Sequence, residues 1–295
     1  MGIVVHDAGG AAIIFSFLEL EKIFAKAFIV GPAKKIVPQA LKYVASNSID
    51  ELIEDIDVLI TGTSYPTKYE LLAVSRAKKM GIKTISFLDS WINYRIRFEM
   101  GYVLIVPDLV VVTDDYGYEI ANKELSEFNI IRCENYYKKK ILLRYSDIVS
   151  KTSAKESGGT LYVTEPTSEF AKKIYGDEKY WGYDEFDGLD FFLENRYLID
   201  QISSRLVIKT HPSEEASKYK KYDQYGVIVE AGNPESLYSL MQEVDTVIGC
   251  STMALVVATW FEKTVFSSIP PGGKGFYLPK KNIRFLSDIV SKHEK

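Results

Sequence analysis

The sequence predicts an α/β protein made of two Rossmann-like domains that face a cleft. In both halves of the chain, short apolar runs typical of buried strands alternate with amphipathic patterns typical of helices. Between the halves lies a polar segment, residues 146–159 (SDIVSKTSAKESGG), whose Ser, Lys and Gly-Gly content is typical of a linker. We therefore expect an N-terminal domain at residues 1–150 and a C-terminal domain at residues 160–295.

Each half predicts a parallel sheet covered by helices on both faces. In the first half, strands are expected at residues 3–5, 27–30, 58–61, 84–88, 109–113 and 130–133, and helices at 11–23, 35–43, 69–80 and 118–127. In the second half, strands are expected at residues 161–164, 206–209, 227–230, 246–248 and 264–267, and helices at 187–202, 234–242, 253–260 and 284–292.

The composition restricts the class of protein and of partner. A hydrophobic content of 46% with 26% charged residues is that of a globular protein. The net charge of −4 argues against a nucleic-acid partner, and two cysteines in different halves argue against a disulfide framework or a zinc site. Without a signal pattern or an apolar run near eighteen residues, we expect a cytosolic protein with no transmembrane segment, for which peripheral membrane association stays open.

Two turns in the second half give the strongest functional signal. Residues 205–210 (RLVIKT) predict a strand that runs into His211 and a proline, and residues 246–249 (TVIG) predict a strand that leads through Ser251 and Thr252 into a helix. Parallel sheets bind ligands at the carboxyl ends of their strands, and a helix N-terminus with an imidazole beside it suits a phosphate. The alternatives are a turn histidine and a plain helix N-cap.

This pattern of Lys-x-His-Pro after one strand and a Ser/Thr pair after a later one resembles bacterial GT-B glycosyltransferases that use CMP-activated sugars. These include sialyl-, polysialyl- and Kdo-transferases of capsule and lipooligosaccharide synthesis, and the CDP-alditol polymerases of teichoic acid synthesis are similar. The likeness covers mainly residues 160–275. It implies that His211, Ser251 and Thr252 bind the phosphates of a nucleotide-sugar donor whose sugar passes to a glycan acceptor, without a cofactor.

The chain departs from those families at two points. Thr252 stands where they commonly carry a second Ser, and their acidic catalytic motif ending in Gly has no clean match, because residues 114–117 (DDYG) contain an inserted Tyr. No metal site is expected, since the DxD-like residues 55–57 precede their strand instead of following it.

The loop after the first strand carries the candidate base. Residues 6–10 (HDAGG) are rich in glycine but do not form the GxGxxG fingerprint. In inverting GT-B enzymes this loop commonly offers a His or Asp to the acceptor hydroxyl, so the resemblance implies Asp7 as first choice for the catalytic base and His6 as second. Gly9 and Gly10 would let a ligand such as the acceptor, or another stretch of backbone, approach closely, and simple tight-turn chemistry is the alternative.

Further candidates follow other strands. Asp89, Trp91, Asn93 and Tyr94 suit sugar recognition, because aromatic faces stack on C–H surfaces while carboxylates and amides bind hydroxyls; the alternative is a helix cap with Trp91 in the core. We expect Glu165 to bind a nucleotide ribose or to act on the sugar, unless residues 167–168 merely cap a helix there.

Residues 270–275 (PPGGKG) form a glycine-rich loop without P-loop spacing, which could carry Lys274 to a phosphate as part of a lid.

The sequence therefore predicts a metal-independent GT-B transferase in which His211 also stabilises the departing phosphate. Two rival hypotheses remain. One is a nucleotide-sugar epimerase or hydrolase of the same architecture, and the other is a non-catalytic nucleotide- or sugar-binding protein.

Overall fold

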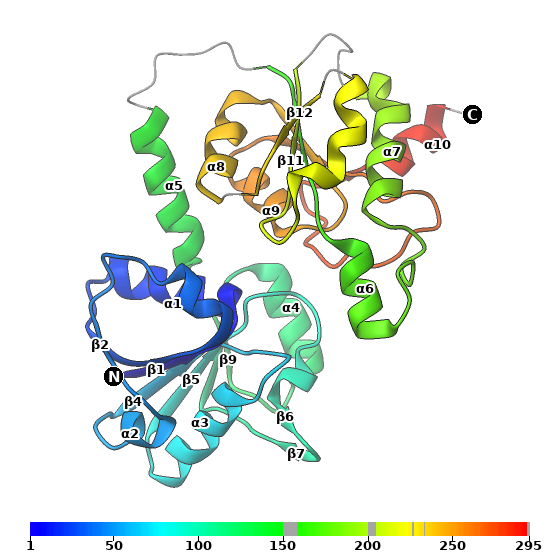
Figure 1. Ribbon diagram of the computed structural model, residues 1–295. Coiled ribbons are helices and arrows are strands. Elements are labelled where there is room, and N and C mark those ends of the chain that lie inside the picture. The colour runs from blue at the N-terminus through cyan, green and yellow to red at the C-terminus, as the bar shows by residue number, and fades with distance from the viewer. Residues whose placement is uncertain (150–157, 200–204, 226, 233, 294–295) are drawn as a thin grey trace. The chain divides into compact units, whose positions relative to one another are not determined.

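The computed structural model describes residues 1–149, 158–199, 205–225, 227–232 and 234–293. The chain divides into two compact units, Met1–Leu143 and Arg144–Lys295, and each contains one large parallel sheet with helices packed on it (Figure 1). The expected α/β class with two Rossmann-like sheets is confirmed. Helix α5 (Tyr136–Val149) includes the first four residues of the expected linker, and residues 150–157 lie outside the described residues.

The sheet of the first unit has seven parallel strands in the order β3-β2-β1-β4-β5-β8-β9. These strands are β1 (Gly2–Val5), β2 (Ala25–Ile29), β3 (Tyr43–Ala45), β4 (Val58–Thr61), β5 (Lys83–Phe87), β8 (Leu109–Val112) and β9 (Ile130–Arg132). The helices are α1 (Ala8–Leu20), α2 (Ile49–Ile53), α3 (Tyr69–Lys79) and α4 (Asp115–Glu124), with 3₁₀ helices at Gly31–Ile36 and Arg95–Phe98 and a small hairpin of β6 (Glu99–Met100) and β7 (Val103–Leu104).

Strand β1 shows how the first sheet is covered on both faces. All four of its residues are buried. Because side chains alternate along a strand, Ile3 and Val5 join the core cluster of α1, while Val4 joins the cluster of α2 and α3. A continuous apolar run is thus explained by a central strand, as the sequence predicted.

The prediction of a helix at residues 35–43 is wrong. The chain forms a 3₁₀ helix over Gly31–Ile36 and then the edge strand β3, which begins at Tyr43. Pro38 interrupts any longer helix, because proline has no backbone N–H to donate and its ring clashes with the preceding turn.

The sheet of the second unit has six parallel strands in the order β12-β11-β10-β13-β14-β15. These strands are β10 (Thr160–Val163), β11 (Leu206–Lys209), β12 (Ile228–Glu230), β13 (Thr246–Gly249), β14 (Thr264–Ser267) and β15 (Arg284–Phe285). The helices are α6 (Thr167–Tyr175), α7 (Glu185–Asn195), α8 (Pro234–Glu243), α9 (Met253–Trp260) and α10 (Leu286–His293), with 3₁₀ helices at Arg196–Leu198 and Ala216–Tyr225.

Two of the expected helices in this unit have different limits. The helix expected at 187–202 begins at Glu185, where Asp184 and Asp187 form a capping box, and its α-helical part ends at Asn195. The helix expected at 284–292 begins only at Leu286, because Arg284–Phe285 pair with β14 as strand β15.

Both sheets reverse their strand order beside their first strand, between β1 and β4 in one unit and between β10 and β13 in the other. Such switch points open a crevice at the carboxyl ends of the strands, where doubly wound sheets bind ligands. The loops that follow these strands are therefore the places to look for a site.

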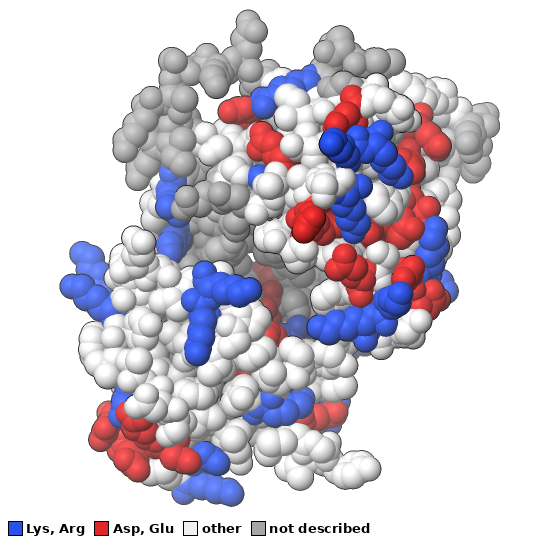
Figure 2. Space-filling view, viewed as in Figure 1, with Lys and Arg blue, Asp and Glu red and all other residues white. Residues whose placement is uncertain are grey.

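The surface and the helices complete this description. On the face shown in Figure 2, basic and acidic side chains lie side by side over the second unit. Among the residues that the structure describes, no helix is both long and apolar enough to cross a membrane.

Candidate functional site

In the first unit, the switch point brings together His6, Asp7 and Ser64. His6 Nδ1 lies 2.6 Å from Asp7 Oδ1 and 3.3 Å from Ser64 Oγ, which belongs to the loop after β4. Asp7 occupies the N-cap position of α1, yet its side chain makes no capping hydrogen bond and is 29% exposed. The carboxylate of Asp7 is thus turned toward the imidazole and is accessible to solvent.

Behind this pair lies Glu70, which sequence analysis did not single out. Glu70 is 2% exposed, and its Oε1 accepts the backbone N–H of His6 at 2.8 Å. Its Oε2 is buried without a hydrogen-bond partner among the described residues. Burial raises the pKa of Glu70 to about 7, and the nearby charge of Asp7 acts in the same direction. The loop that carries the candidate base therefore rests on a buried carboxyl group.

The glycines of this loop are packed against protein. A Cβ atom at Gly9 would lie 2.0 Å from Asp89 Oδ2, and one at Gly10 would lie 3.1 Å from the Cα of Gly62. Close approach between neighbouring loops explains both glycines, so their expected contact with an acceptor stays a prediction.

Asp89 is held by Arg97, a partner that sequence analysis missed. The guanidinium of Arg97 donates to Asp89 Oδ1 at 3.0 Å, to the carbonyl of Thr63 at 2.6 Å and to Ser90 Oγ at 2.6 Å. Burial raises the pKa of Asp89, although the charge of Arg97 opposes the change. The hydrogen bond from Arg97 to the Thr63 carbonyl ties this segment after β5 to the loop after β4.

The other expected sugar-binding residues have structural partners. Trp91 Nε1 donates to both carboxylate oxygens of Asp114, at 3.1 and 3.0 Å, and Asp114 caps α4 by accepting the N–H of Gly117 at 2.7 Å. Asn93 adopts a left-handed backbone with φ +58°, which Asn tolerates better than most residues. Tyr94 is buried in the core, and this burial raises its pKa.

In the second unit, His211 lies two residues after the end of β11, and its neighbours fix its tautomer. The backbone N–H of Ser213 donates to His211 Nδ1 at 3.2 Å, and the hydroxyl of Ser213 lies 2.7 Å from the same nitrogen. Because Nδ1 accepts a hydrogen bond, it carries no proton, and the proton of the neutral ring lies on Nε2. Burial lowers the pKa of His211, although the charge of Glu214 opposes it, so the ring is neutral at pH 7. Nε2–H makes no hydrogen bond to the part of the chain that the structure describes, so it can donate to a ligand.

The loops after β10 and β13 meet at the second switch point. Thr252 is the N-cap of α9, and its Oγ1 accepts the N–H of Ala254 at 3.4 Å. The backbone N–H of Ser251 donates to Glu165 Oε1 at 2.7 Å, and Ser251 Oγ accepts the N–H of Tyr277 at 3.3 Å. The site at the N-terminus of α9 is therefore joined to two other loops of the same unit.

Glu165 is a carboxyl group placed where the sequence predicted a phosphate. Burial raises its pKa to about 7, and the negative charges of Glu214 and Glu185 add to this rise, while the N–H of Ser251 lowers it. A group that titrates near neutral pH is suited to exchanging protons with a ligand.

Lys274 lies on a loop that is attached to the unit at several points. Its side chain is exposed, and its backbone N–H donates to the carbonyl of Trp181 at 2.8 Å. The next residue, Gly275, has φ +87° and lies against the indole ring of Trp181, where a Cβ atom would come within 2.7 Å. The expected contact of Lys274 with phosphate stays a prediction.

Lys209 also belongs to the His-Pro turn. It is buried, and its amine donates to the carbonyl of Ala231 and to Ser236 Oγ in the segment after β12. Gly232 of that segment packs against the backbone of His211, where a Cβ atom would lie 2.6 Å away. Lys209 thus holds the segment after β12 that packs against the His-Pro turn. No cluster of His, Cys, Asp and Glu suitable for a metal occurs among the described residues.

No protein-family model and no curated protein sequence matches the chain. Among solved structures, the chain is similar to UDP-GlcNAc 2-epimerase from Methanocaldococcus jannaschii, with 10% identity, a TM-score of 0.58, and coverage of 100% of this chain and 91% of the other. It is also similar to the wall teichoic acid polymerase TagF, with 12% identity, a TM-score of 0.54, and coverage of 99% of this chain and 78% of the other.

The chain has a GT-B-like fold. At these identities the likeness concerns the fold, so the donor nucleotide and the particular resemblance to CMP-sugar transferases stay predictions.

Proposed function

We propose that the chain is a nucleotide-sugar-dependent glycosyltransferase that works in the cytosol, with the donor bound in the second unit and the acceptor glycan in the first. The observation that carries this proposal is the meeting of three loops at the switch point after β10, β11 and β13. They bring an Nε2–H of neutral His211 and the hydroxyls of Ser251 and Thr252 to one sheet edge. Such donors suit the phosphates of an activated sugar.

The chemistry follows from these groups. Nε2–H of His211 and the N-terminus of α9 would stabilise the negative charge that develops on the departing phosphate. Asp7, partly exposed and paired with His6, would take the proton from the acceptor hydroxyl. One similar structure favours a nucleotide-activated substrate, since it is a UDP-GlcNAc 2-epimerase, and the other, a wall teichoic acid polymerase, favours a glycan-type polymer as acceptor.

A second candidate function is epimerisation of a nucleotide sugar. It is favoured by the similarity to an epimerase over the full chain and by Glu165, whose pKa near 7 suits proton transfer at a sugar carbon. A transferase needs an acceptor for turnover, whereas an epimerase converts the donor alone. Incubation of UDP-GlcNAc with the protein, followed by proton NMR with and without acceptor glycans, separates the two.

The donor site is tested by calorimetry with CMP, CDP, UDP and GDP. His211→Ala and Ser251→Ala should each weaken binding of the preferred nucleotide by about 1.5–3 kcal/mol, the contribution of a hydrogen bond to a charged group. Ser217→Ala, at an exposed serine of the same unit, is the matched control and should bind like the wild type. Equal affinity in all three variants, or no nucleotide bound by the wild type, would refute the assignment of the site. Binding without turnover of any donor would favour a non-catalytic binding protein.

A further inference from the structure

A relay of hydrogen bonds connects the His-Pro turn to the loop after β10. The backbone N–H of His211 donates to Thr164 Oγ1 at 3.0 Å and, over a longer 3.4 Å, to Glu214 Oε2, and Thr164 Oγ1 lies 2.5 Å from the same Glu214 oxygen. Because an amide N–H can only donate, the hydroxyl oxygen of Thr164 accepts this hydrogen bond. The O–H of Thr164 then donates a hydrogen bond to Glu214. The direction of the relay, from His211 through Thr164 to Glu214, is thus fixed by the chemistry of the groups.

Glu214 is anchored on its far side. Its side chain is fully buried, and its Oε1 accepts the amine of Lys218 at 2.8 Å and the hydroxyl of Tyr219 at 2.8 Å. The carboxylate therefore has protein partners on both oxygens. Since each oxygen is held, Glu214 has little freedom to rotate away from Thr164.

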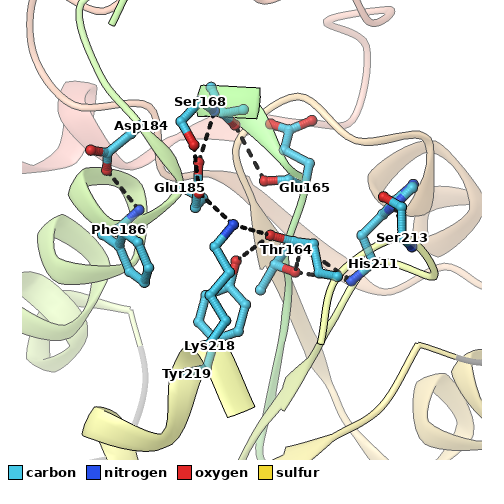
Figure 3. Close-up of polar contacts among 12 residues, drawn as sticks. Thr164, Glu165, Ser168, Asp184, Glu185, Phe186, His211, Ser213, Lys218 and Tyr219 are labelled. Atoms are coloured by element: carbon cyan, nitrogen blue, oxygen red, sulfur yellow. Dashed lines mark hydrogen bonds and ion pairs between the residues drawn. The ribbon is translucent and has the colours of Figure 1, made fainter. Parts of the chain in front are cut away.

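Lys218 extends the network to the other end of the same loop. Its amine lies 2.5 Å from Glu185 Oε1, and Glu185 accepts both the backbone N–H and the hydroxyl of Ser168 at 2.8 Å. Figure 3 shows Lys218 reaching toward Glu185 on one side and toward the Thr164 corner on the other. The two residues that this network holds, Thr164 and Ser168, lie before and after Glu165 in the sequence.

Forming this network costs desolvation free energy, so it is an inefficient way to stabilise a fold. Two carboxylates and one amine are withdrawn from water, and the desolvation of buried ion pairs often offsets their attraction. What the network does provide is a fixed geometry, because the relay joins the backbone of His211 directly to the residue that precedes Glu165.

We propose that Thr164 and Glu214 are positioning residues of the donor site. They set the placement of His211 relative to Glu165 and, through the Glu165–Ser251 hydrogen bond, relative to the N-terminus of α9. This inference rests on the proposed function, because the phosphate site that it shapes is the one assigned above. Both side chains are buried and act on His211 rather than on the ligand.

The test compares two substitutions at Thr164. Thr164→Val keeps the shape of the side chain but removes the hydroxyl, whereas Thr164→Ser keeps the hydroxyl. We expect Thr164→Val to weaken binding of the nucleotide that the wild type prefers among CMP, CDP and UDP by at least about tenfold, and Thr164→Ser to stay within about twofold. Tyr222→Phe is the matched control, since it removes a partly buried hydrogen bond to Asp190 in the same unit. It should lower the melting temperature without changing affinity.

The outcomes separate this inference from the proposed function. Wild-type affinity in Thr164→Val, or an equal loss of affinity in Tyr222→Phe, overturns the positioning role. If the wild type binds no nucleotide, the proposed function fails, and hydrogen exchange of the free protein then decides the relay. Exchange at residues 211–214 should rise in Thr164→Val and be restored in Thr164→Ser, and unchanged exchange would refute the relay itself. If Thr164→Val does not fold, Lys218→Met perturbs the same relay from its far end.

Discussion

Glu70→Gln removes a charge from the interior of the first unit while leaving the hydrogen bond to His6 in place. The amide oxygen of Gln can accept the His6 N–H as Oε1 of Glu70 does at 2.8 Å. The amide nitrogen would replace Oε2, which has no partner among the described residues, and its cost does not depend on pH. Any pH dependence of the stability difference between variant and wild type therefore reports the carboxyl group.

The magnitude follows from the pKa of Glu70. Raising this pKa from 4.5 to about 7 corresponds to about 3 kcal/mol, at 1.36 kcal/mol per pKa unit. Because the folded protein holds the proton more tightly than the unfolded chain, the stabilising contribution is fully present below pH 4.5 and is lost as the pH rises through 7. Relative to Glu70→Gln, the wild type should lose about 2.5 kcal/mol of unfolding free energy between pH 5 and pH 8.

Urea denaturation at four pH values between 5 and 8 measures this loss. Fluorescence of Trp91 in a background of Trp181→Phe and Trp260→Phe observes the first unit alone. Ser16→Ala is the control, since among the described residues its hydroxyl bonds only the carbonyl of Ala12, and its destabilisation should be the same at every pH. If the difference between Glu70→Gln and wild type does not change with pH, then Glu70 is not the buried, neutral-pH titrating group described above.

Two further predictions concern the same unit. Gly9→Ala places a Cβ atom against Asp89 and displaces its carboxylate from Arg97, so we expect a destabilisation of about 1–3 kcal/mol in urea, whereas an unchanged midpoint would contradict the packing. Asp7→Asn should leave nucleotide affinity unaltered, because the donor site proposed above lies in the other unit, and should lower glycosyl transfer by about 10²–10⁴-fold in an assay of nucleotide release. Full transfer activity in Asp7→Asn would shift the role of base to His6.

The sequence predicted the central strands because their burial leaves a direct trace. Strands such as β1 and β10 are buried along their whole length and read as continuous apolar runs. Edge elements leave a weaker trace. Strand β3 has only three residues, of which two are exposed, so it was not expected. Helix α6 mixes polar and apolar residues over nine positions, so it was expected only as the alternative in which residues 167–168 cap a helix. Helix α2, with five residues, was missed for the same reason.

The candidate site could be predicted only as far as strand ends define it. His211, Ser251 and Glu165 each follow a strand, so their positions at one sheet edge followed from the alternation alone. Their partners could not be predicted, because these contacts join distant parts of the chain. Glu165 lies 86 residues from Ser251, and His6 lies 64 residues from Glu70. No local spacing encodes such pairs, since they arise from tertiary packing.

The hydrogen bond from Ser251 to Glu165 has a consequence for how any anion enters the second unit. In the free protein this amide already donates to the internal carboxyl group of Glu165, whereas the hydroxyl of Ser251 accepts the amide of Tyr277 and keeps its own proton to donate. At the amide, an incoming phosphate would exchange one partner for another rather than add a new bond. Inorganic phosphate would then gain little, and net affinity would have to come from the remainder of the ligand. The resting site would discriminate against abundant small anions before any nucleotide arrives.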